Sequence, residues 1–191
     1  MHTIYHTDAI VLKSMPAGEA NRRVWLFTRE LGLVVALVQG VRKAEAKLKS
    51  HIVEYSYIRA DLVRGKEVWR LINAETISTP LGGIIDTDRA RSFVRILLSI
   101  ERFVIDEGPH EALFDHVAEC AACLADESLP VKAYDTVAIW RVFVLLGYSA
   151  LDESYAIYMQ QPLHTVVTTS TDDMIGVLMK DVQQSIAQTH L

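Results

Sequence analysis

The sequence is poor in the features that mark secreted and membrane-spanning proteins. Two cysteines among 191 residues are too few for a disulfide scaffold. No run of about 18 apolar residues occurs, and the opening MHTIYHTDAIVLK lacks a basic segment followed by a long apolar stretch. We therefore expect no membrane span, no signal peptide and a cytoplasmic location.

Motifs that support catalysis are also missing. The sequence contains no G-x-S-x-G, no H-E-x-x-H and no G-x-x-x-x-G-K-[ST]. Glu19 is a lone carboxylate in a predicted turn, where a structural hydrogen bond is a more ordinary role than that of a general base. We expect the protein not to be an enzyme and to need no cofactor.

Charged residues are present but divided unevenly along the chain. Half of the residues are hydrophobic and 23% are charged, which is enough apolar material for packed cores, and the net charge is −5. Residues 1–80 carry 12 Lys and Arg against 8 Asp and Glu, whereas residues 81–191 carry 7 against 16. This asymmetry suggests two modules, of which only the first suits phosphates; uneven solvation of one domain is the alternative.

The first 80 residues have the pattern of a small β-barrel. Turn material separates five segments rich in Val, Ile, Tyr, Trp and Thr: AIVLKS, RRVWLFT, LVVALVQ, IVEYSYIRADLV and EVWRLINAETI. In the fourth segment, Val53, Tyr55 and Tyr57 alternate with polar residues, which predicts a half-buried strand. Five short strands predict a closed barrel, because closure removes exposed edges, and an OB-fold has this size and strand count.

After Pro80 the apolar spacing changes to threes and fours, which predicts amphipathic helices. Three such stripes run over 93–104, 113–124 and 137–147, and a fourth over 175–186 predicts a short last helix. Residues 152–173 read as a loop with room for one short strand. Strands followed by helices without alternation indicate the α+β class, with an OB-fold domain over 1–80 and an α-helical domain over 81–191.

A basic stretch, QGVRKAEAKLKS at 39–50, stands out in an acidic protein. Loops rim the face of an OB-fold that holds single-stranded nucleic acid, and mobile Lys and Arg side chains there neutralise phosphates. A solvated loop, or a short helix formed by AEAKLK, is the alternative. The candidate nucleic-acid-binding residues lie in this stretch and near other predicted turns: Arg22, Arg23, Arg42, Lys43, Lys47, Lys49, Arg64 and Lys66, with Lys13 a further cation.

Aromatic residues in the same region have two interpretations. Trp25, Tyr55, Tyr57 and Trp69 all fall in predicted strands, where an aromatic side chain is more often part of the core than a platform for bases.

The pattern H-x3-C-x2-C, formed by His116, Cys120 and Cys123, has the residue types of a metal site. All three residues fall on one predicted helix, however, and the Cα atoms of His116 and Cys123 would be about 10 Å apart along its axis. Three ligands from one straight helix fit zinc poorly. We therefore interpret the cysteines as buried structural thiols and expect no metal.

The N-terminal segment DAIVLKSMPAGEANRRVWLFTRELGLVVALVQGVRK resembles the start of the bacterial RecO family of recombination mediators. Members open with a strand, a GE-containing turn, an L-F-T-x-E-x-G segment and A-x-G-x-R-[KR]. The corresponding elements here are Gly18-Glu19, the run 26–32, and Gly40-Val41-Arg42-Lys43. EVWRLINAETI and LGY at 146–148 extend the likeness more loosely, to about residue 150.

The resemblance implies an N-terminal OB-fold and a helical domain that bind single- and double-stranded DNA and anneal complementary strands. It also implies work with single-stranded DNA-binding protein, and loading of the RecA recombinase together with RecR. The basic surface of the family corresponds to Arg22, Arg23, Arg42, Lys43, Lys47 and Lys49. The acidic C-terminal half agrees poorly with direct DNA binding and better with protein contacts or with steering of DNA toward the barrel.

Two departures from the family pattern limit what is carried over. Many relatives have a four-cysteine zinc module soon after LGY, whereas SALDESYAIYMQQP contains no cysteine. The chain also ends 43 residues after Tyr148, which is shorter than we expect for the family. A pocket for the tail of single-stranded DNA-binding protein is therefore not assigned to residues.

The leading hypothesis from the sequence is a noncatalytic DNA-binding and strand-annealing mediator of the RecO type. The acidic second half and the short C-terminal region support an alternative, a protein-interaction adaptor whose OB-fold has lost DNA binding. An RNA-binding OB-fold protein is a third hypothesis. The sequence does not distinguish DNA from RNA.

Overall fold

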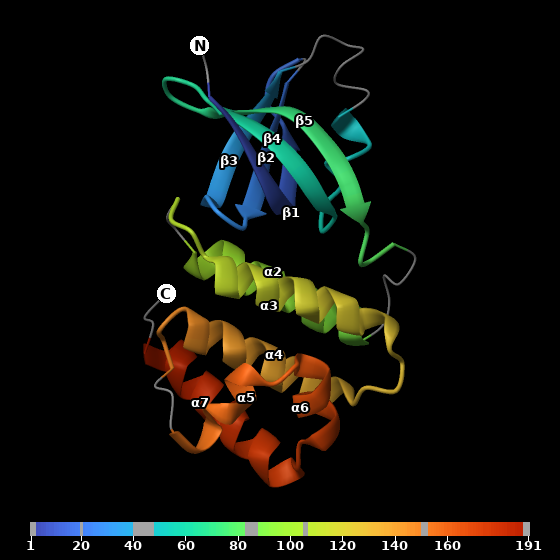
Figure 1. The fold of residues 1–191 in the computed structure, drawn as a ribbon, viewed down its shortest axis with the longest axis vertical. Helices are drawn as coiled ribbons and strands as arrows, with labels where there is room; N and C mark the ends of the chain where they lie inside the picture. The colour runs from blue at the N-terminus through green and yellow to red at the C-terminus, as the bar shows by residue number, and fades with distance from the viewer. Residues whose placement is uncertain are drawn as a thin grey trace. The chain divides into compact units, whose positions relative to one another are not determined.

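A computed structural model of the chain (Figure 1) describes residues 3–19, 21–39, 48–82, 88–104, 107–149 and 153–188. The chain forms two compact units, of which the first comprises Met1–Ile84 with Ile100–Phe114 and the second Ile85–Ser99 with Asp115–Leu191. The domain boundary at residue 80 stays a prediction.

The first unit contains a closed five-stranded barrel in the order β1-β2-β3-β5-β4. Neighbouring strands are antiparallel except for β3 and β5, which are parallel. The predicted class, a five-stranded OB-fold followed by helices, is thereby confirmed. The strands are β1 (Ile4–Pro16), β2 (Asn21–Thr28), β3 (Gly32–Gln39), β4 (Tyr57–Arg64) and β5 (Trp69–Ser78).

Alternation along the strands fills the barrel. Val24 and Leu26 of β2 and Val34, Ala36 and Val38 of β3 are almost completely buried and belong to one hydrophobic cluster. The residues between them point to the other side of the sheet, because successive side chains of a strand alternate. The period of two that predicted these strands therefore also separates core from surface residues.

One predicted strand segment is a turn. Residues 52–56 precede β4, and Ser56 N–H donates to the Val53 carbonyl (3.1 Å) while Tyr55 N–H donates to the Val11 carbonyl (2.6 Å). Tyr55 has φ of 68°, in the left-handed region, and Val53 is 53% exposed. The alternation in VEYSYI was thus a wrong guide at Val53 and Tyr55, since a turn places them by its own dihedral angles.

The predicted helices over 93–104, 113–124 and 137–147 are present. They correspond to α2 (Asp88–Phe103), α3 (Glu111–Ala122) with the 3₁₀ turn η1 (Cys123–Ala125), and α4 (Val131–Leu145). No helix among the described residues is long and apolar enough to cross a membrane.

The C-terminal part of the chain is more helical than predicted. The supposed loop over 152–173 contains η2 (Glu153–Tyr155), α5 (Ile157–Gln160) and α6 (Leu163–Thr169), and the supposedly short last helix is α7 (Asp172–Gln188), of 17 residues. The β-branched run LHTVVTT suggested a strand, but Leu163, Val166 and Val167 are buried at the i, i+3, i+4 spacing of a helix. Packing therefore overrides propensity here.

Candidate nucleic-acid interface

One outward face of the barrel combines cations with apolar side chains. Strand register arranges it in two rows, because residues paired across a sheet point to the same side. The first row joins Met15, Arg23, Leu37 and Arg70 across β1, β2, β3 and β5, and the second joins Lys13, Trp25 and Val35 across β1, β2 and β3. We call these seven residues the cationic sheet face.

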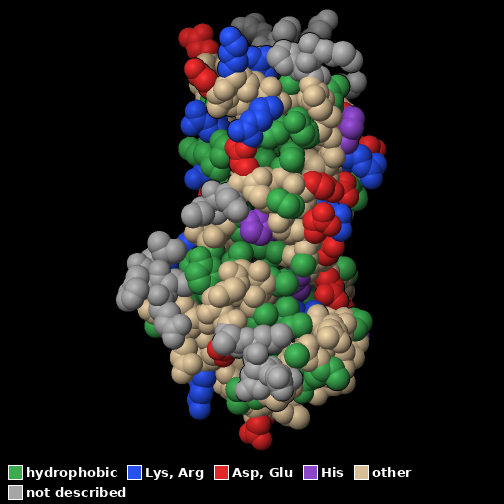
Figure 2. All heavy atoms as spheres, turned by 60° about the vertical axis from the view of Figure 1, so that its left-hand side comes forward, with side chains coloured by type: hydrophobic (Ala, Val, Ile, Leu, Met, Phe, Trp, Pro, Cys, Tyr) green, Lys and Arg blue, Asp and Glu red, His purple; other side chains and the backbone are tan. Residues whose placement is uncertain are grey.

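The cationic sheet face carries positive charge without local compensation. Arg23 and Arg70 are exposed, Lys13 and Trp25 are half-buried, and the Lys13 Nζ atom lies 5.5 Å from the centre of the Trp25 ring. Neither row contains a carboxylate. Within the described part of the chain, no ion pair joins any of the three cations to an acid. Figure 2 shows Lys and Arg side chains among hydrophobic ones on the barrel.

The next row along the same strands is buried at Ile10 and Phe27 and half-buried at Leu33. Ile10 pairs with Phe27, and Phe27 pairs with Leu33, yet Phe27 is completely buried. Its ring centre lies 5.6 Å from that of Phe114, in the same compact unit. Phe27 is therefore closed to a ligand, whereas Met15 of the first row and Val35 of the second are exposed.

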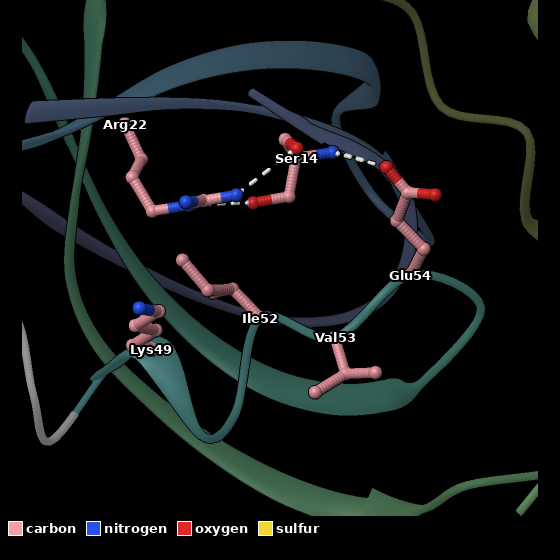
Figure 3. Close-up of a pocket in the computed structure, with 6 residues that line it drawn as sticks. All are labelled: Ser14, Arg22, Lys49, Ile52, Val53 and Glu54. Carbon is pink, nitrogen blue, oxygen red and sulfur yellow. Dashed lines mark hydrogen bonds between the residues drawn. The ribbon is translucent and has the colours of Figure 1, made fainter. Parts of the chain in front are cut away.

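A small hollow lies beside the end of β1 and the start of β2, with a volume of about 260 Å³. Six residues line it: Ser14, Arg22, Lys49, Ile52, Val53 and Glu54. The Arg22 guanidinium donates from Nε to the Ser14 hydroxyl (3.0 Å) and from Nη2 to the Ser14 carbonyl (3.1 Å). Glu54 Oε1 accepts from the Ser14 N–H (3.0 Å). Figure 3 shows Arg22 and Lys49 directed into the same space.

The structure separates cations that the sequence grouped. Arg22 and Arg23 are adjacent on β2, so Arg22 shares the side of Val24 and lines the hollow, whereas Arg23 shares the side of Trp25. Lys49 joins Arg22 at the hollow. Three other candidates, Arg42, Lys43 and Lys47, lie outside the described residues.

Arg64 and Lys66 do not share the environment of the hollow or of the cationic sheet face. The Arg64 guanidinium carbon lies 4.9 Å from the centre of the Trp69 ring, and Arg64 also forms an ion pair with Glu107. Trp69 is 5% exposed, which agrees with its interpretation as a core residue. Lys66 is exposed in the turn between β4 and β5. Arg64 is therefore already engaged, while Lys66 is free to contact an anion.

Sequence reasoning identified Lys13 and Arg23 among the seven residues of the cationic sheet face and left Trp25 open between a core residue and a platform for bases. Arg70 was overlooked because it lies inside a predicted strand rather than at a turn, and the apolar members Met15, Val35 and Leu37 were not assigned. A usable signal existed: Val24 and Leu26 mark the buried side of β2, so Arg23 and Trp25 must share the other. Applied to β5, buried Trp69 and Leu71 place Arg70 outward in the same way.

In the second unit, His116, Cys120 and Cys123 form a structural cluster. His116 Nε2–H donates to the Ala138 carbonyl (3.0 Å), and the Cys120 sulfur lies 3.5 Å from the same nitrogen. Burial raises the pKa of the Cys120 thiol well above its usual value. Both cysteines are buried and unpaired, and the described residues contain no group of three His, Cys, Asp or Glu placed to hold a metal ion.

Beside this cluster, a buried Arg141 ties α4 to the segment that follows it. Arg141 donates to Glu119 (3.2 Å) and to the carbonyls of Tyr158 and Gln161, and the Leu163 N–H donates to Glu119. Partial burial raises the pKa of Glu119. The His116 ring, the Leu163 N–H and the Arg141 charge lower this pKa by more than burial raises it, so the net shift is downward. Glu119 is therefore an ionised structural partner of Arg141.

The chain is similar to proteins involved in recombination. Residues 1–80 match the family model described as "Recombination protein O N terminal". A protein of Gloeothece citriformis named "DNA repair protein RecO" is 28% identical over 79% of this chain and 53% of its own length. A Nocardioides protein of the same name is 28% identical over 76% and 61%, and one of Streptomyces avermitilis is 33% identical over 56% and 46%. The chain spans about half the length of the curated relatives it matches.

Proposed function

We propose that the chain is a member of the RecO family, whose N-terminal model matches residues 1–80, and that its barrel binds single-stranded DNA on the cationic sheet face. The observation that supports this proposal most is that half-buried Trp25 lies beside Lys13, in the row next to that of Arg23 and Arg70, with no carboxylate in either row. A face of this composition combines the two interactions that a single strand offers.

The two interactions have different physical origins. Cations release counterions condensed on the phosphates, which favours binding and makes it depend on salt concentration. An aromatic ring stacks on an unpaired base, and such stacking tolerates any base because every base has a π-face. Exposed Met15 and Val35 add apolar surface around Trp25. The face therefore suits an unpaired strand of any sequence, with a weaker, phosphate-only contact to a duplex.

The wider role that we propose is DNA repair and recombination: the names of the relatives state DNA repair for those proteins, and the description of the family model states recombination. The chain would act without catalysis in the cytoplasm, binding single- and double-stranded DNA and promoting annealing, because cations between two strands lower their mutual repulsion. Partners in this proposal are single-stranded DNA-binding protein, RecR and, indirectly, the RecA recombinase.

Fluorescence anisotropy with an oligothymidylate of about 16 nucleotides and a matched duplex tests the binding proposal. We expect tighter binding to the single strand, with affinity that falls as salt is raised. Affinity that does not respond to salt would contradict the phosphate contacts. Capture of protein partners from nuclease-treated lysate, with no nucleic-acid binding in anisotropy, would favour the adaptor hypothesis instead.

A competition of the labelled strand with a ribonucleotide oligomer of the same length decides between DNA and RNA. The cationic sheet face contacts phosphates and stacks bases, and neither interaction requires a 2′-hydroxyl. We therefore expect the DNA oligomer to compete at least as well as the RNA oligomer.

A further inference from the structure

The hollow lined by Ser14, Arg22, Lys49 and Ile52 to Glu54 is separate from the cationic sheet face, yet it adjoins that face through consecutive residues of β2. Arg22 lines the hollow and Arg23 belongs to the face. The two side chains lie on opposite sides of β2, one and two residues from its start at Asn21, so a strand that crosses the face at Arg23 reaches the hollow by turning around this end of β2. The hollow therefore has the position to receive the end of a bound strand.

Its cations are prepared to hold an anion. Two hydrogen bonds to Ser14 fix the Arg22 guanidinium, so its remaining N–H groups keep one direction without further ordering. Among the described residues, Lys49 has no carboxylate partner, and its side chain enters the hollow from another segment of the chain. Two cations from separate segments therefore face one small volume.

The size of the hollow restricts what it can take. Its volume of about 260 Å³ lies below the roughly 300–1,000 Å³ of sites for drug-sized ligands. A phosphate group with part of its sugar fits this space, and buried Ile52 offers the sugar an apolar wall. A phosphomonoester carries a charge of about −1.5 to −2 at neutral pH. It is therefore attracted more strongly by Arg22 and Lys49 than a phosphodiester, which carries a single charge, when it lies on the side of the hollow away from the Glu54 carboxylate.

Glu54 distinguishes the end of a strand from its interior. Figure 3 shows its carboxylate on the far side of the hollow from Lys49, held toward the Ser14 N–H. A strand that continued through the hollow would bring its next phosphate toward this carboxylate, and like charges repel. A terminal nucleotide has no next phosphate. We propose that the hollow binds the phosphomonoester at one end of a DNA strand that lies on the cationic sheet face.

This inference rests on the proposed function, and its test compares three oligothymidylates that differ in one group: a 5′-phosphate, a 3′-phosphate, or no terminal phosphate. We expect one phosphorylated end to bind about fivefold more tightly than the unphosphorylated oligomer, since two partly exposed charge contacts each contribute modestly. If all three oligomers bind with equal affinity, and binding still depends on the cationic sheet face, the proposal of a terminal-phosphate site in the hollow is overturned and the proposed function stays intact.

Three variants assign the preference to the hollow. Lys49→Gln removes a cation that forms no ion pair with a residue of the described ranges, so it should abolish most of the fivefold preference without affecting the fold. Arg22→Gln should do the same if thermal unfolding shows that the fold survives the loss of the Ser14 contacts. Glu54→Gln keeps an acceptor for the Ser14 N–H, and it should narrow the preference by improving binding of the unphosphorylated oligomer. Arg23→Gln, one residue away, should weaken all three oligomers equally.

A titration with thymidine 5′-monophosphate, followed by the backbone amide signals of Ser14 and Glu54, tests the hollow even if no oligomer binds. We expect saturable shifts with the monophosphate that thymidine does not produce and that Lys49→Gln removes. Inorganic phosphate serves as the probe without sugar and should bind more weakly. Identical responses to thymidine and its monophosphate, or shifts that persist in Lys49→Gln, would overturn the proposal.

Discussion

Removing the three cations of the cationic sheet face should lower the salt dependence of single-strand binding by a calculable amount. Lys13, Arg23 and Arg70 occupy two adjacent rows and lack ion-pair partners among the residues described. Each can therefore neutralise one phosphate. The perturbation is the triple variant Lys13→Gln, Arg23→Gln, Arg70→Gln, which keeps side chains of similar length.

The magnitude follows from counterion release. Each phosphate neutralised on a single strand contributes about −0.7 to the slope of log K against log salt, so three contacts contribute roughly −2. Three contacts therefore make the binding constant of the unaltered protein fall by roughly an additional 20-fold between about 50 and about 200 mM salt, and the variant should lack this additional fall. Anisotropy titrations at several salt concentrations measure the slope of each protein directly.

The matched control is Arg59→Gln. Arg59 is exposed on β4, but its Nε atom lies 3.6 Å from the Asp8 carboxylate and it belongs to neither row of the face. We expect its slope to equal that of the unaltered protein. A triple variant with an unchanged slope, or an Arg59→Gln variant that loses as much per cation, would refute the assignment of phosphate contacts to this face.

Five further substitutions test stacking, electrostatics and backbone conformation. Trp25→Ala should weaken single-strand binding about tenfold without altering the salt slope, and bound strand should quench the Trp25 fluorescence of the unaltered protein. Arg141→Met should lower the free energy of unfolding in urea by about 3 kcal/mol, because Glu119 is left without its partner. The lowered pKa of Glu119 makes it stabilising above its ordinary pKa and less so as pH falls through the lowered value, so Glu119→Gln should reduce the loss of stability in acid. Gly18→Ala should destabilise by about 1 kcal/mol because φ is +81°, whereas Gly176→Ala, inside α7 with open space at its Cβ, should stabilise by a similar amount.

The barrel was predictable because its period of two is strong. Val24, Leu26, Val34 and Ala36 alternate with less buried residues, and this pattern alone defines two strands and their inner faces. The same pattern misled at Val53 and Tyr55, where a turn happens to place apolar residues two apart. A local pattern cannot reveal a left-handed residue that is held by a hydrogen bond to the distant Val11.

In the helical half, helices with a long repeat of apolar residues were predictable from the sequence, and helices with a short repeat were not. α2 has 16 residues and repeats its apolar spacing several times, whereas α6 has 7 and shows the spacing only at Leu163, Val166 and Val167. The segment before α6 is held to α4 by hydrogen bonds from Arg141 to the Tyr158 and Gln161 carbonyls. Contacts of this kind between segments far apart in sequence leave no periodic signal.

The candidate site was only partly predictable for a different reason. Charge counting identified the first 80 residues as basic, but a count does not say which cations share a surface. Register divides Arg22 from Arg23 and joins Arg23 to Leu37 and Arg70 across three strands. The parallel pairing of β3 with β5 creates that junction, and the strands' own sequences do not specify which neighbour each will have.

The most direct test of the central claim is photo-crosslinking of the protein to a single-stranded oligomer carrying 5-iodouracil, with the crosslinked peptides identified by mass spectrometry. Binding on the cationic sheet face predicts crosslinks at Trp25 and in peptides from β1, β2 and β3, and their loss in the triple variant. Crosslinks confined to residues 115–188, with none in the barrel, would contradict the claim.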